Sequence, residues 1–251
     1  MAERTRASGS GRIEVDDASA LNAPSGDAAD APPDLRTALR NATTELHRDL
    51  DHAPEQRALL AAAITLGDYA TIMTKHRHAL ASAEATIASL DHARASDLPP
   101  YRPRLPALEA DLASLGASGL SATEAGAHDM PAVEAEAAMD ASVARGRYLG
   151  TRYVLEGSTL GAAAIARRLE RHLPELRASA FAYWRVQAEE APAWQAFALT
   201  LASLPSHGPL ASAAIAAAGD TFGAFLRAFG LEAPHPDHPI PADPEPAGAR
   251  R

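Results

Sequence analysis

YVLEGSTLGAAAI, residues 153–165, has the composition of a helix except for two glycines four residues apart, Gly157 and Gly161. A glycine inside a helix costs about 1 kcal/mol relative to alanine, so this segment gives up helix stability. Because residues four apart share a helix face, the pair leaves a flat strip of bare backbone. Gly146 and Gly150 repeat the spacing upstream. Such a strip could lie against another helix, a second backbone or a planar ligand, and the spacing leaves these alternatives open.

Helical patterns continue on both sides of this segment. Over residues 69–90 apolar side chains recur every three or four positions, which predicts an amphipathic core helix with Asp68 as its N-cap. No alternating run of Val, Ile, Thr and Tyr stands out, so strands are not expected. We therefore predict an all-α bundle. Its helices are expected over residues 35–50, 54–67, 69–90, 105–115, 131–173, 175–203 and 209–229.

The region around the glycines has two interpretations. Residues 131–173 can form one long helix or two helices with a bend at the glycines, because glycine is a known cause of kinks. The two ends of the chain lack helical periodicity: residues 1–33 are rich in Ala, Asp, Ser, Gly and Pro, and residues 232–251 are rich in Pro. We expect one helical domain over residues 34–231, between two disordered tails.

The composition excludes several classes of function. The formal charge of −9, from 23 basic and 32 acidic residues, argues against binding to nucleic acid or to an anionic membrane. The absence of cysteine excludes a disulfide scaffold, a thiolate-bound metal and a cysteine nucleophile. Neither a membrane-spanning run of apolar residues nor a signal peptide is readable. We expect a cytoplasmic protein.

Histidine is the side chain best suited to bind a metal in a helical protein without cysteine. Most of the ten histidines fall in expected loops, in the C-terminal tail or near helix ends, which leaves His47 and His76. His76 lies on the apolar face of its helix, where a hydrogen-bonded core residue is expected. Asp51 follows His47 by one helical turn and could orient its imidazole for metal binding. Spacing alone does not separate this role from a chance pair.

Two segments together resemble the heme oxygenase family. LRTALRNATTELHRDLD, residues 35–51, resembles its first helix, in which a Thr-x-x-x-His segment bears the proximal heme ligand. YVLEGSTLG, residues 153–161, resembles the distal helix of the bacterial branch, including the enzymes associated with bacterial phytochromes. Leu66-Gly67-Asp68-Tyr69 is similar to a short family signature between them. The resemblance extends over roughly residues 35–230.

The resemblance implies a heme oxygenase-like bundle with heme b, both substrate and cofactor, between these two helices. His47 would coordinate the iron, and Asp51 would take the place of the carboxylate that orients this ligand. Arg40 matches the position of a basic residue that holds a heme propionate in relatives. Its alternative role is that of a solvated helix charge.

The catalytic residues that the resemblance implies are Gly157, Ser158 and Gly161. The two glycines would let the distal backbone approach the heme face and the bound dioxygen closely. Ser158 stands, as in bacterial relatives, where the eukaryotic enzymes carry an aspartate that organises distal water. The basic propionate anchors of a late helix are not evident near residues 194–204, and Arg177 and Arg185 are possible substitutes.

The implied reaction is the oxidative cleavage of heme b by O2 to biliverdin, carbon monoxide and ferrous iron. Because the chain has no Gly-rich nucleotide fingerprint, the electrons would come from an external reductase or ferredoxin. A bacterial phytochrome is a possible acceptor of the biliverdin. The alternative is a non-catalytic heme- or bilin-binding protein of the same fold, which the missing anchors favour.

Overall fold

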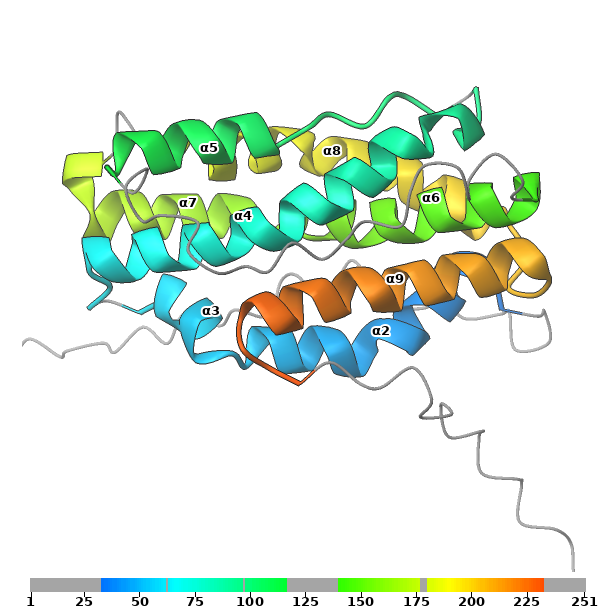
Figure 1. Cartoon of the computed structure of the whole chain (residues 1–251), viewed down its shortest axis with the longest axis horizontal. Helices are drawn as coiled ribbons and strands as arrows, with labels where there is room; N and C mark the ends of the chain where they lie inside the picture. The colour runs from blue at the N-terminus through cyan, green and yellow to red at the C-terminus, as the bar shows by residue number, and fades with distance from the viewer. Residues whose placement is uncertain (1–32, 62, 97, 117–139, 177–179, 233–251) are drawn as a thin grey trace, which may run out of the picture. The chain divides into compact units, whose positions relative to one another are not determined.

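The computed structural model in Figure 1 describes residues 33–61, 63–96, 98–116, 140–176 and 180–232. Within these ranges the chain forms helices and no β-strand, which confirms the all-α prediction. Two short 3₁₀ turns, η1 (Asp91–Ala93) and η4 (Pro174–Leu176), accompany the α-helices. In chain order the α-helices are α2 (Leu35–Asp51), α3 (Pro54–Leu59), α4 (Leu66–Ser89), α5 (Leu105–Ser114), α6 (Ala141–Gly157), α7 (Thr159–His172), α8 (Ala182–Ala202) and α9 (Pro209–Ala228).

Several helix ends differ from the predicted ones. Of the two interpretations of residues 131–173, the structure has the second, because α6 and α7 are separate helices that meet at Ser158; residues 131–139 lie outside the described ranges. α8 begins at Ala182 and not near residue 175, where the chain instead forms the turn η4. The two tails predicted to be disordered lie outside the described ranges apart from their innermost residues, so their disorder stays a prediction.

Side-chain caps explain where two of the helices begin. Asp34 accepts a hydrogen bond from the Thr37 amide at 2.7 Å and starts α2 as expected. At α4 the cap is Thr65, because its hydroxyl accepts from the Asp68 amide and the Asp68 carboxylate accepts from the Thr65 amide. Asp68 is therefore the third residue of the helix, in a reciprocal capping box, and the prediction that it is the cap was wrong.

α9 packs against α2, α4 and α6. Two glycines make its crossing with α6 very close: a Cβ on Gly146 would lie 2.3 Å from the carbonyl oxygen of Leu210, and one on Gly150 would lie 2.0 Å from that of Ala214. No side chain fits at such distances. This upstream glycine pair therefore serves a helix crossing, one of the alternatives that the spacing left open.

α9 is also the one helix in the described part of the chain that is long and apolar enough to cross a membrane. Half of this apolar stretch is buried inside the bundle. A core helix of a soluble protein meets the same criteria, so the finding is weak evidence for a membrane span.

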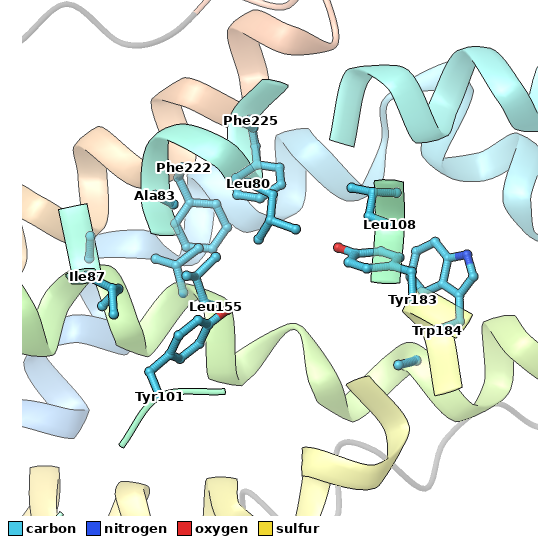
Figure 2. Packing of buried hydrophobic residues seen from close by; sticks show 14 of the residues in the cluster. Leu80, Ala83, Ile87, Tyr101, Leu108, Leu155, Tyr183, Trp184, Phe222 and Phe225 are labelled. Atoms are coloured by element: carbon cyan, nitrogen blue, oxygen red, sulfur yellow. The ribbon is translucent and has the colours of Figure 1, made fainter. Parts of the chain in front are cut away.

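Figure 2 shows part of the core, where Leu80 of α4, Leu155 of α6 and Phe222 of α9 pack together. His76 of α4 belongs to this interior, as its place on the apolar face predicted. Its side chain is 7% exposed, its ring lies 5.5 Å from that of Trp184 in an edge contact, and burial lowers its pKa to about 4. Nε2 of His76 lies 3.3 Å from the amide nitrogen of Gln56.

We expect Gly150→Ala to lower the free energy of unfolding by about 1–3 kcal/mol or more, because the new Cβ must force the α6 and α9 backbones apart. Gly161→Ala is the matched control, since it adds a Cβ to a helical glycine that has nothing within 4 Å of that position. The control should be neutral or stabilise the protein by about 1 kcal/mol. Urea unfolding of the ligand-free protein measures both, and equal effects would contradict the close crossing.

Because His76 is buried with a lowered pKa, we expect the free energy of unfolding to fall in mild acid. Its pKa is about 4 in the folded protein against an ordinary value of 6.5, so the unfolded chain binds more protons between these pH values. The free energy of unfolding should therefore decrease as the pH falls from 6.5 towards 4, by about 3 kcal/mol in total. His76→Leu should remove this part of the slope in urea unfolding at pH 7 and pH 4.5. An unchanged slope in the variant would show that other groups cause it.

Candidate functional site

His47 lies near the end of α2 with its side chain 63% exposed. Its Nδ1 is 2.9 Å from Oδ2 of Asp51, one turn further on. This hydrogen bond raises the pKa of His47, partial burial opposes the shift, and the charge of Asp51 adds to it. The ring also meets the ring of Phe222 from α9 edge-on, with 5.9 Å between centroids. Because Nδ1 is bound to the carboxylate, Nε2 is the nitrogen that can coordinate a metal.

α2 and α6 meet one turn before His47. The Thr43 side chain of α2 lies close enough to the Tyr153 hydroxyl of α6 to lower the pKa of that hydroxyl, and we call this place the α2/α6 seam. Figure 1 shows the two helices running in the same direction. Since His47 follows Thr43 by one turn and Gly157 follows Tyr153 by one turn, both lie beyond the seam towards the same end of the bundle.

Two arginines of α2 lie close to this seam. Burial raises the pKa of Tyr153, and the positive charges of Arg36 and Arg40 partly offset that rise. Both guanidinium groups therefore lie within electrostatic reach of the Tyr153 hydroxyl. Arg40 is a predicted site residue. Arg36 is not, although its spacing of four from Arg40 places it on the same face of the helix.

At the break between α6 and α7, two side-chain hydroxyl groups donate hydrogen bonds to backbone carbonyl oxygens at the end of α6. α6 ends at Gly157, Ser158 joins the two helices and α7 starts at Thr159. The Ser158 hydroxyl donates to the carbonyl oxygen of Leu155 at 2.7 Å, and the Thr159 hydroxyl donates to that of Glu156 at 2.7 Å. Carbonyl groups near the helix end thus gain side-chain partners, as chain breaks in helices require.

The strip formed by Gly157 and Gly161 differs from the upstream glycine pair. A Cβ on Gly157 would have only the Trp194 ring nearby, at 3.8 Å, and a Cβ on Gly161 would have nothing within 4 Å. The neighbouring Leu160 is 57% exposed. Among the described residues no helix therefore fills this strip, and the helix-crossing explanation holds for Gly146 and Gly150 alone.

The other two predicted propionate anchors, Arg177 and Arg185, are not seen as unpaired side chains at the α2/α6 seam. Arg177 lies outside the described residues, and Arg185 of α8 is bound to Glu170 of α7 at 2.8 Å. Two surface hollows, one beside Tyr101 and one beside Pro54, include neither His47 nor the glycine strip. The structure shows an exposed imidazole with an oriented ring on α2, two arginines of the same helix near Tyr153, and a strip of little-covered backbone from the end of α6 into α7. These groups suit a flat, anionic ligand that carries a metal.

Comparison with known proteins decides the family. Residues 33–230 match the family model described as heme oxygenase. The chain belongs to the heme oxygenase family. It is 30% identical over 165 residues to a protein named heme oxygenase from Xanthomonas campestris pv. campestris (strain 8004), which is 66% of this chain and 90% of that protein.

The match to the heme oxygenase family spans both helices that carry the candidate site, α2 and α6, together with α7. It supports the resemblance that the two sequence segments suggested. Several residues around the candidate site lie outside the quoted motifs or had no assigned role: Thr43, Tyr153, Trp194 and Arg36. Tyr153 and Thr43 both stand one turn before a predicted site residue, which was the available signal.

Proposed function

We propose that this protein is a heme oxygenase that cleaves heme b to biliverdin, carbon monoxide and ferrous iron, with O2 and with electrons from an external reductase or ferredoxin. The observation that carries the proposal is the contrast between the two glycine pairs. Gly146 and Gly150 are filled by α9, whereas a Cβ on Gly157 would meet only the Trp194 ring and one on Gly161 would meet nothing within 4 Å. Bare backbone costs helix stability, and a planar substrate explains why it is retained.

On the proximal side, His47 would bind the heme iron through Nε2. Nδ1 of His47 donates a hydrogen bond to the Asp51 carboxylate. This bond fixes the tautomer of His47 that leaves Nε2 free, and it makes the imidazole a stronger ligand. The edge contact with Phe222 limits rotation of the ring. Bound heme supplies the iron centre for oxygen chemistry and is itself the molecule that is oxidised.

On the distal side, Gly157 and Gly161 would let the backbone approach the macrocycle, because any side chain there would occupy the space over its face. Ser158 has its hydroxyl 2.7 Å from the Leu155 carbonyl and 2.9 Å from the side-chain oxygen of Gln187. These contacts favour a role for Ser158 in holding the break between α6 and α7.

Arg40, and with it Arg36, would neutralise the heme propionates at the α2/α6 seam. Both charges act on Tyr153, so the three groups form one polar cluster at the α2/α6 seam. The proposal also includes use of the product as a phytochrome chromophore, which rests on the resemblance, and a cytoplasmic location, which rests on the sequence having no readable signal peptide or membrane span.

The alternative function is that of a non-catalytic heme- or bilin-binding protein. The observation in its favour is that the late-helix segment at residues 194–202 offers no basic side chain and that Arg185 is already paired with Glu170. Incubating the purified protein with hemin, O2 and a reducing system separates the two functions. Biliverdin and carbon monoxide support the oxygenase, and a heme spectrum that persists without either product supports the binding protein. Isomer analysis of the biliverdin then gives the site of cleavage.

We expect His47→Ala to weaken hemin binding by about tenfold or more and to abolish the spectral signature of an imidazole on iron, because the proximal ligand is lost. Hemin titration followed through the Soret band measures this. His76→Leu is the control, since His76 is buried in the core and should leave the ligand spectrum unchanged. If His76→Leu removed the signature and His47→Ala kept it, the ligand assignment would be wrong.

We expect Gly161→Leu to reduce hemin affinity by about tenfold or more and to stop cleavage, because the side chain would cover the proposed heme face. The fold should persist, since nothing lies within 4 Å of a Cβ at this position. Arg167→Leu, at an exposed position on another face of the same helix, is the control. Wild-type affinity and turnover in Gly161→Leu would show that the strip does not face the substrate.

A further inference from the structure

Directly behind the glycine strip lies a buried cluster of three charged side chains. Oε2 of Glu156 is 2.7 Å from Nη2 of Arg104, and Oε1 is 3.1 Å from Nε of Arg152. All three side chains are at most 2% exposed. We call Glu156, Arg104 and Arg152 the buried triad. Glu156 immediately precedes Gly157, so the triad is attached to the residue at which α6 ends.

The two arginines are themselves fixed from other parts of the chain. Nη1 of Arg152 donates to the carbonyl oxygen of Pro99 at 2.7 Å and lies 3.0 Å from the Tyr148 hydroxyl. The backbone amide of Arg104, at the start of α5, donates to the carboxylate of Glu84 from α4 at 2.6 Å. The position of the Glu156 carboxylate is therefore set by α4, by the loop before α5 and by α6 together.

The triad also controls the backbone at the break. The carbonyl oxygen of Leu155 accepts hydrogen bonds from Nη1 of Arg104 and from the Ser158 hydroxyl. Ser158 in turn touches Gln187 of α8, a side chain that is 1% exposed. Residues 155–158 are thus held on their inner side by several polar groups, while the outer side carries the bare strip. Any movement of the inner contacts would move the strip.

We propose that Glu156, clamped by Arg104 and Arg152, is a positioning residue that fixes the backbone of Gly157 and so sets the clearance of the distal strip over its ligand. The first part of this proposal concerns the ligand-free protein, and the consequence for the ligand rests on the proposed function. Two guanidinium groups on one carboxylate define its place more strictly than a single pair does. If Glu156 only stabilised the bundle, it could stand elsewhere on α6, and its place directly before Gly157 would have no purpose.

The test variant is Glu156→Gln, which keeps the shape of the side chain and one acceptor oxygen but removes the charge. The matched control is Asp111→Asn. Asp111 is a fully buried carboxylate of α5 that accepts hydrogen bonds from the amides of Ala182 and Tyr183 at 2.9 Å each, at the start of α8. Both variants neutralise a buried carboxylate, and only one of these carboxylates is next to Gly157.

The first measurement is amide hydrogen exchange in the ligand-free full chain. Glu156→Gln should accelerate exchange over residues 153–161 by about tenfold or more, and Asp111→Asn should accelerate it at the start of α8 instead. If residues 153–161 exchange at the wild-type rate in Glu156→Gln, or equally fast in both variants, Glu156 does not position Gly157 and the proposal is overturned.

The second measurement uses the hemin-loaded protein after reduction and addition of carbon monoxide. The C–O stretching frequency reports the surroundings of the iron-bound ligand, so it should shift in Glu156→Gln and stay at the wild-type value in Asp111→Asn. An unshifted frequency in Glu156→Gln would overturn the effect on clearance. If the wild-type protein bound no heme, the proposed function would fail, and the exchange pattern would still decide whether Glu156 holds the glycine.

Discussion

One carboxylate shared by two buried arginines is the constraint on which the glycine-bearing region depends. Removing one partner from a buried ion pair typically costs about 3–5 kcal/mol, because the remaining charge is left without compensation. Glu156 therefore cannot shift without a large penalty, and neither can the backbone that follows it. The proposed role of Glu156 would make the break at Ser158 a fixed feature and not a frayed helix end. Gly157 follows Tyr153 of the α2/α6 seam by one turn of α6, as His47 follows Thr43 of the seam by one turn of α2.

The two glycine pairs illustrate what a spacing can and cannot predict. Both pairs have the same separation, and both give up the same helix propensity. One pair meets the backbone of α9, whereas in the other pair Gly157 meets only the Trp194 ring and Gly161 meets open space. The difference depends on where α9 lies, and α9 is placed by contacts with α2, α4 and α6 that join distant parts of the chain. The local spacing predicts that backbone without side chains is needed. Only the tertiary arrangement shows whether another helix packs against that backbone.

Much of the fold and part of the candidate site could be predicted from local patterns. The all-α class, the core position of His76 and the pairing of His47 with Asp51 follow from residues a few positions apart, where helical geometry settles the neighbours. The buried triad could not be found in this way. Arg104 joins Glu156 from fifty-two residues away, in a Pro-rich segment that reads as a loop. A polar side chain finds its partner there only once the bundle has assembled.

The crossing of α6 and α9 also limits how these two helices can change in evolution. The atoms that a side chain at position 150 would strike first belong to the backbone of residue 214, and position 146 faces the carbonyl of residue 210 in the same manner. Side-chain volume can be traded between two packed helices, but backbone atoms cannot be made smaller. No second-site substitution in α9 could therefore suppress a defect at Gly150. We expect relatives that keep this crossing to vary freely on the outer face of α9 while retaining glycine on α6.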